Sequence, residues 1–177
     1  FVNSDMVSSI LFSAGGFEAK YGDKMSSVLD ITYKKPIKNT ASIKLSLLGG
    51  SSHVEGTTKN GRLSYLVGVR HKTNQYLLNS LDTEAEYKPV FSDIQTFINY
   101  ELNTNWKINF LGNISQNKYQ MVPQNRETEF GTINEALKLR IYFEGQEIDR
   151  YETYFGALNT VFQPNTNLQL QFTSSAF

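Results

Sequence analysis

From residue 39 onward, apolar and polar residues alternate along most of the chain. In the range 41–47, alanine, isoleucine and leucine alternate with serine and lysine. A period of two indicates strands whose two faces meet different environments. The chain is therefore predicted to be mainly β, with about seven antiparallel strands between residues 39 and 177. Besides the first, the segments expected to be strands are 52–58, 62–72, 93–102, 106–115, 150–163 and 168–172.

The connections between these strands fall into two classes. Short turns are predicted at 59–61, 103–105 and 164–167, whereas 73–91 and 118–149 are long and irregular, the second with a candidate strand at 137–143. In a meander, the short turns lie at one end of the sheet and the long connections at the other. Membrane β-barrels sort their connections in this way, and strands of about ten residues suit a tilted crossing. A β-sandwich has no reason to sort them, although a short turn predicted at Gly49-Gly50 breaks the rule.

The same alternation predicts which side chains would face lipid and which the interior of a barrel. Tyr100 and Trp106 flank the short turn at 103–105, and barrels place aromatic residues at the membrane interface. Packing in a soluble core is the alternative for these two rings. The polar residues of the same strands are candidates for the interior: Gln95, Asn99, Glu101, Lys107, Asn109 and Asn113.

Composition narrows the classes of function. The chain has 177 residues, a formal net charge of zero, no cysteine and two histidines that lie far apart, His53 and His71. These features give no reason to expect nucleic-acid binding, a thiolate metal site or a His-rich metal site. The chain also lacks an apolar run of the roughly 20 residues that a spanning helix needs. Ten tyrosines and twelve phenylalanines, with many uncharged polar residues, suit a β-rich protein.

The first 35 residues predict a separate small unit. A helical turn is expected after Asn3, a strand at 9–13, a glycine turn, a helical turn at 17–21 that ends at Gly22, and a strand at 26–33. A basic linker at 36–38 begins with Pro36 and separates this unit from the strands at 39–177. The chain opens inside a folded segment and stops inside a strand, so we interpret it as a fragment.

One motif in this unit is more specific than the rest. Gly15-Gly16-Phe-x-Ala-x-Tyr21-Gly22 is followed by Ser-x-Val-x-Asp30-Ile. The order of strand, glycine turn, Tyr-Gly and strand resembles the end of the plug domain of TonB-dependent outer-membrane receptors, in the version common in Bacteroidota-type bacteria. The segment 144–158 is also similar to barrel strands of these receptors. The resemblance implies that 1–35 is the C-terminal part of an α/β plug and that 39–177 begins a plugged transmembrane β-barrel.

The resemblance also implies a function, partners and a location. Receptors of this family take up a scarce ligand across the outer membrane of a Gram-negative bacterium, when the TonB complex pulls on an N-terminal segment that this chain would lack. Siderophore, cobalamin, oligosaccharide and peptide all remain open as ligands. Outer-membrane lipid is a partner, a surface lipoprotein is compatible with the family, and no enzyme activity, cofactor, metal or nucleic acid is expected.

Candidate ligand contacts come from the long connections, because receptors place binding groups on loops. The aromatic residues there are Tyr76, Tyr87, Phe91, Tyr119 and Phe130. An acidic cluster with Arg150 could bind a cation, but its spacing fits no calcium-loop pattern and favours a solvated loop; it contains Glu144, Glu147, Asp149 and Glu152. Arg70 and Arg126 could hold an anion, although an arginine in such a position is more often a simple structural charge.

Two other classes of protein fit part of the pattern. A passive or structural outer-membrane barrel would share the strands and sorted connections, but it would not need the motif at 13–33. A soluble or surface-exposed β-rich binding or adhesion module would need neither a lipid-facing alternation nor sorted connections. The location of residues 1–35 relative to the strands discriminates among the three.

Overall fold

The computed structural model describes residues 2–22, 26–78, 85–123, 125–132, 135–142 and 145–177, and the protein is mainly β. The N-terminal part contains the 3₁₀ turn η1 (Ser4–Met6), strand β1 (Val7–Ala14), the 3₁₀ turn η2 (Ala19–Tyr21) and strand β2 (Ser27–Tyr33). The main sheet follows, with β3 (Thr40–Ser46), β4 (Gly49–Thr57), β5 (Leu63–Thr73), β7 (Val90–Glu101), β8 (Trp106–Pro123), β11 (Glu147–Asn165) and β12 (Leu168–Ala176).

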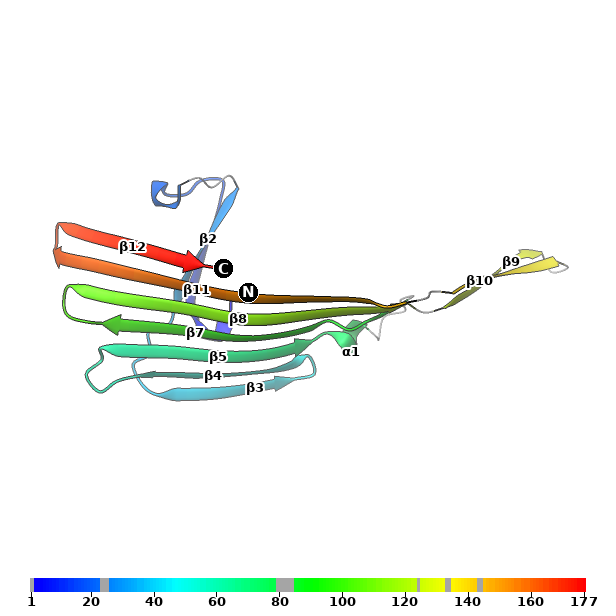
Figure 1. Cartoon of the computed structure of the whole chain (residues 1–177), viewed down its shortest axis with the longest axis horizontal. Helices are drawn as coiled ribbons and strands as arrows, with labels where there is room; N and C mark the ends of the chain where they lie inside the picture. The colour runs from blue at the N-terminus through cyan, green and yellow to red at the C-terminus, as the bar shows by residue number, and fades with distance from the viewer. Residues whose placement is uncertain (1, 23–25, 79–84, 124, 133–134, 143–144) are drawn as a thin grey trace.

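The main sheet is an antiparallel meander. Its strands lie in the order β12-β11-β8-β7-β5-β4-β3, so each strand pairs with its neighbours in the chain, and a short extra strand, β6 (Ala85–Tyr87), pairs with β8. The turns after β4, β7 and β11 lie at one end of the sheet, and the long connections leave from the other end (Figure 1). The predicted large antiparallel sheet with sorted connections is therefore confirmed.

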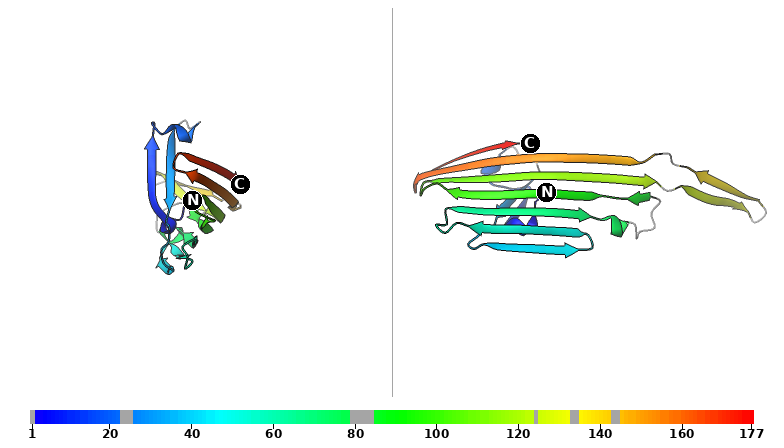
Figure 2. Two further views of the ribbon diagram at one scale, coloured as in Figure 1. Left: turned by 90° about the vertical axis from the view of Figure 1, so that its left-hand side faces the viewer. Right: turned by 60° about the horizontal axis from the view of Figure 1, so that its bottom comes forward.

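Strands β1 and β2 form a two-stranded sheet that is separate from the main sheet. Strands β1 and β2 pair antiparallel as a separate hairpin, which stands to one side of the main sheet (Figure 2). Asn3 caps η1 by accepting a hydrogen bond from the Asp5 backbone N–H at 3.1 Å, and Gly22 ends η2. The sequence predicted both of these turns and both strands. We call residues 2–33 the N-terminal hairpin.

The first turn of the main sheet differs from the prediction. Leu47 and Leu48 make the turn, and Gly49 and Gly50 already belong to β4. Gly49 has a φ of 122°, and a Cβ there would lie 2.1 Å from the backbone oxygen of His71 on β5. This glycine is therefore needed for the close approach of two strands, a role that a glycine pair in a sequence does not distinguish from a turn.

Both long connections contain more structure than predicted. The first holds α1 (Gln75–Leu78) and β6, and β7 begins at Val90. In the second, β8 and β11 continue as a long pair as far as Met121 and Glu147, and between them lies a hairpin of β9 (Arg126–Thr132) and β10 (Glu135–Ile141). Pairing between strands that are distant in sequence extends β8 and β11 well beyond the stretch that alternates in hydrophobicity.

The two faces of the main sheet differ in chemistry. One face, called the polar face below, carries the six residues that were predicted to face an interior: Gln95, Asn99, Glu101, Lys107, Asn109 and Asn113. The opposite face, called the apolar face, carries in register Tyr65, Val69, Ile94, Ile98, Phe110, Ile114, Tyr154 and Leu158. Strand alternation thus sorts polar from apolar side chains across four strands.

Little apolar surface is buried. Among the described residues, Met6 and Leu66 are the large apolar side chains that are fully buried, whereas Asn3, Ser64, Asp93, Gln95, Asn113 and Ser115 are buried polar residues. Many apolar side chains are exposed, with Ile43 at 77% and Phe172 at 68%. A soluble domain buries its apolar stripe and exposes its polar one, and here the main sheet does the reverse. No helix among the described residues is long and apolar enough to span a membrane.

Candidate functional site

The start of the N-terminal hairpin is bound to the middle of the polar face. The backbone N–H of Asn3 donates to the Gln95 side-chain oxygen at 3.0 Å, and Arg70 donates from Nη1 to the backbone oxygen of Val2 at 3.0 Å. Arg70 also forms a two-point ion pair with Asp93 on the neighbouring strand, with Nε 2.8 Å from Oδ1. The Asp93 side chain is 0% exposed. A buried ion pair therefore orients the guanidinium that holds the hairpin.

Asp5 adds a second set of contacts. Its carboxylate accepts hydrogen bonds from the ammonium of Lys44 on β3 and, at 3.2 Å, from the hydroxyl of Ser51 on β4. The Lys44 hydrogen bond is the main reason that the pKa of Asp5 is lowered, and burial works against it. Lys34, at the far end of β2, donates to the Asp5 backbone oxygen at 2.6 Å. Asp5 therefore ties η1 to the first two strands of the main sheet.

Close packing completes the attachment. A Cβ on Gly68 of β5 would lie 2.4 Å from the side-chain nitrogen of Asn3 and 3.0 Å from the sulfur of Met6. The missing side chain of Gly68 leaves the space that the side chains of Asn3 and Met6 occupy. At the same end of the hairpin, Tyr33 pairs with Val7, and its ring stacks on Phe97 with centroids 4.7 Å apart. Desolvation in this contact raises the pKa of Tyr33.

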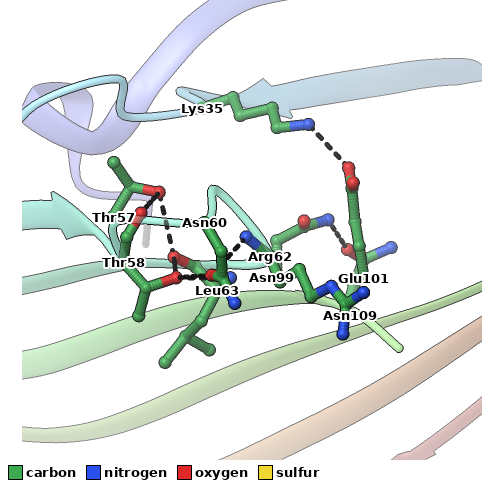
Figure 3. A network of polar contacts seen from close by, with 9 residues as sticks. All are labelled: Lys35, Thr57, Thr58, Asn60, Arg62, Leu63, Asn99, Glu101 and Asn109. Carbon is green, nitrogen blue, oxygen red and sulfur yellow. Dashed lines mark hydrogen bonds and ion pairs between the residues drawn. The ribbon is translucent and has the colours of Figure 1, made fainter. Parts of the chain in front are cut away.

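A ladder of polar side chains crosses the polar face beside the hairpin, and Figure 3 shows its first step, between Asn99 and Asn109, with the nearby Lys35–Glu101 pair. Asn99 donates to Asn109, Asn109 donates to Asn159 at 3.2 Å, and Asn159 donates to Thr173 at 2.7 Å, so the ladder joins four strands. Lys35, just after β2, reaches Glu101 at 2.8 Å. A hollow of about 440 Å³ separates β2 from the ladder. The hairpin is therefore attached at a few points and does not fill the space over the sheet.

The motif residues come together inside the hairpin. The hydroxyl of Tyr21 donates to Asp30 of β2, which joins η2 to the strand that follows it. This hydrogen bond is the main reason that the pKa of Tyr21 is raised. Gly15 has a φ of 84°, as a turn that requires glycine should, whereas Gly16 and Gly22 meet no atom within 4 Å of an added Cβ. The motif therefore shapes the hairpin.

The sequence predicted that the candidate ligand-contact residues lie in irregular loops. In the structure they belong to strands and a short helix instead. Tyr87 is on β6 and Tyr119 on β8, with ring centroids 6.2 Å apart. Phe91 is on β7, and the guanidinium carbon of Arg70 lies over its ring, 5.3 Å from the ring centroid. Phe130 is half exposed on β9. Tyr76 belongs to α1, but its side chain, like that of Arg126, lies outside the described part. Their role as ligand contacts stays a prediction.

The acidic cluster is divided between the two faces of β11. Glu147 and Asp149 share the polar face with Tyr119. Glu152 lies on the apolar face, and Glu144 is outside the described residues. In the described ranges no three acidic or histidine side chains are grouped so that they could hold a metal ion.

Sequence reasoning did not assign the central roles of Asp5, Gly68 and Asp93. Each is an ordinary residue in a strand or turn, and only the position of the hairpin brings them together. Comparison with protein-family models, curated proteins and solved structures finds no match to this chain. Its function must therefore be inferred from its own residues and contacts.

Proposed function

We propose that this chain is part of a TonB-dependent outer-membrane receptor, in which the N-terminal hairpin is the end of the plug and the main sheet is the first part of the barrel wall. The observation that carries the proposal is the attachment of the hairpin to the polar face through Arg70, Asp93 and Gln95, while the opposite face is apolar and exposed. A plugged barrel needs this combination, because its inner face holds a polar domain and its outer face meets lipid.

The dimensions of the apolar face support a membrane wall. Along β11, the row that contains Tyr154 and the row that contains Phe162 lie about 26 Å apart, at about 3.3 Å per residue. With the strands tilted, this covers most of the roughly 25 Å apolar band of outer-membrane barrels. Trp106 and Phe162 pack with ring centroids 4.5 Å apart at the short-turn end, and Tyr100 is on a neighbouring row. Such rings suit the interface of lipid and water.

The contacts between hairpin and wall suit a plug that must move. They are hydrogen bonds and ion pairs, together with two small packing contacts, of Met6 against Gly68 and of Tyr33 on Phe97. Water can replace such polar contacts at a modest net cost, of about 0.5–1.5 kcal/mol for a neutral hydrogen bond. Force on a segment before residue 1 would therefore detach η1 without unfolding the wall. The function is energy-coupled uptake of a scarce ligand, with no chemical step by this chain.

The other two classes of protein are less well supported. A passive or structural barrel has no need for a hairpin that is held by a buried ion pair. A soluble or surface module would expose to water the apolar rows that include Ile43, Phe172 and Leu170, a surface prone to association. The ligand can still be a siderophore, cobalamin, an oligosaccharide or a peptide, since the hollow beside the ladder has no feature that selects one.

A reversible cross-link in the full-length protein tests this function. Cysteines at Asn3 and Gly68 would join hairpin and wall where these residues touch. Growth tests first identify which class of ligand the protein takes up. With that ligand, we expect oxidation of N3C/G68C to abolish energy-dependent uptake and a reductant to restore it. As a matched control, A41C/V54C joins two wall residues that are paired in β3 and β4 and should leave uptake intact.

Two results would contradict the proposal. Uptake that continues in the oxidised N3C/G68C protein, or that needs no energy source, would indicate a passive barrel. A protein that fractionates with soluble or peripheral components instead of the outer membrane would indicate a surface module.

A further inference from the structure

A row of polar side chains borders the apolar face at the end from which the long connections leave. His71, Ser92, Gln116 and Glu152 are direct partners across β5, β7, β8 and β11. The His71 ring nitrogen Nδ1 lies 2.8 Å from the Ser92 hydroxyl, and Gln116 donates to Glu152 at 3.1 Å. The next row toward the short turns is apolar, with Val69, Ile94, Ile114 and Tyr154. The surface thus changes from polar to apolar between two adjacent rows of the same face.

The surface is hollowed where these two rows meet. The hollow has a volume of about 420 Å³, and its walls include side chains of both rows, among them Ile94, Ile114, Gln116 and Glu152. Hydrogen-bonding groups line one end of it and hydrocarbon lines the other. An occupant that satisfies both ends must be amphiphilic.

Two cations lie one row beyond the polar row on the same face. Lys118 and Arg150 are direct cross-strand partners on β8 and β11, and strand alternation places them on the side of Gln116 and Glu152. Like charges directly opposite each other destabilise a sheet. Within the described part of the chain, neither forms an ion pair.

The neighbouring acids do not neutralise these cations. Glu152 accepts hydrogen bonds from Gln116 and, at 3.2 Å, from the hydroxyl of Tyr154. Glu147 and Asp149 alternate onto the polar face. The Lys118–Arg150 pair therefore offers adjacent cationic donors to an anion that comes from outside the chain.

We propose that this border is a binding site for a phosphorylated glycolipid of the outer leaflet. Lys118 and Arg150 bind its phosphate, the row from His71 to Glu152 exchanges hydrogen bonds with its sugar hydroxyls, and its acyl chains lie on Ile94 and Ile114. The inference rests on the proposed function, which puts the long connections outside the cell. The positive charges of Lys118 and Arg150 are complementary to a phosphate. The row from His71 to Glu152 combines uncharged polar side chains with one carboxylate, which suits hydroxyl groups better than a second anion.

Binding of purified lipid A, a diphosphorylated and acylated glucosamine disaccharide, to the delipidated full-length protein in non-ionic detergent tests the site. We expect the Kd for K118Q/R150Q to rise at least tenfold. The matched control K59Q/R62Q removes the same charge at the short-turn end and should bind like the wild type. E152Q should bind at least as tightly, because it removes the one acid beside the phosphate while an amide oxygen remains as an acceptor.

Competing lipids identify the source of the phosphate. Dephosphorylated lipid A should bind the wild-type protein as weakly as lipid A binds K118Q/R150Q, and phosphatidylglycerol should bind at least tenfold more weakly than lipid A. Equal affinities of wild type and K118Q/R150Q for lipid A would overturn the site. Equal affinities for lipid A and phosphatidylglycerol would overturn the glycolipid assignment. The heat-modifiable electrophoretic mobility of each variant reports whether it is folded. The uptake measured in the cysteine cross-linking experiment tests the proposed function separately.

Discussion

At the scale of single residues, the molecule depends on a few side chains with unusual surroundings. Asp93 is a charge with no exposed side-chain surface, Gly68 leaves room for η1, and Asp5 meets two strands at once. None of these residues stands out in the sequence. Each acquires its role because the N-terminal hairpin lies against the polar face.

Asp5 makes the attachment of η1 sensitive to acid. Because its folded-state pKa is below the ordinary value of 3.8, Asp5 stabilises the attachment above that value, and this contribution is lost as the pH falls through the lowered pKa. We expect the protection of η1 amides from hydrogen exchange, relative to the intrinsic rate at each pH, to fall below about pH 4 in the wild type. D5N should exchange faster at neutral pH and show a weaker acid response. An identical acid response in D5N would assign the effect to other carboxylates.

At the scale of elements, the attachment between the hairpin and β5–β7 depends on the Arg70–Asp93 pair. Removing one partner of a buried pair leaves an uncompensated charge, which costs about 3–5 kcal/mol. We therefore expect R70M to lower the free energy of unfolding by that amount and to expose the segment before β1 to protease. R70M/D93L should recover much of the stability but not the protection, because the donor to Val2 is still absent.

An exposed ion pair provides the control for this prediction. Lys35 is 62% exposed where it meets Glu101, and such pairs contribute about 0–1 kcal/mol. K35M should therefore unfold within about 1 kcal/mol of the wild type. A loss in K35M as large as that in R70M would show that burial of Asp93 is not what makes the Arg70 pair important.

At the scale of the whole molecule, the main sheet has an exposed apolar face and a polar face that carries another unit. F110R would place a charge within the apolar rows, and N109R would place the same charge on the polar face one residue away. At the middle of a bilayer, arginine costs about 2–4 kcal/mol. We expect F110R to reduce assembly into outer membranes, measured by heat-modified gel mobility, and N109R to assemble normally. Equal assembly of the two variants would argue against a lipid-facing role for Phe110.

The strands of the main sheet and the turns at Asn60-Gly61 and 103–105 followed from the sequence, because alternation and turn chemistry are local. The long pair of β8 and β11 and the β9–β10 hairpin did not. Their residues have weak alternation, and their pairing depends on partners distant in the chain. Gly49 was wrongly assigned to a turn because its close contact is with the backbone of β5.

The sequence by itself determined that the chain is β-rich and which side chains share a face, because the period of a strand fixes these properties locally. Only the tertiary structure decided that the N-terminal hairpin lies on the polar face, that Arg70 and Asp93 hold it, and that Lys118 and Arg150 stand side by side at the border of the apolar face. These are relations between residues far apart in sequence, and strand register sets them only when the whole sheet has formed.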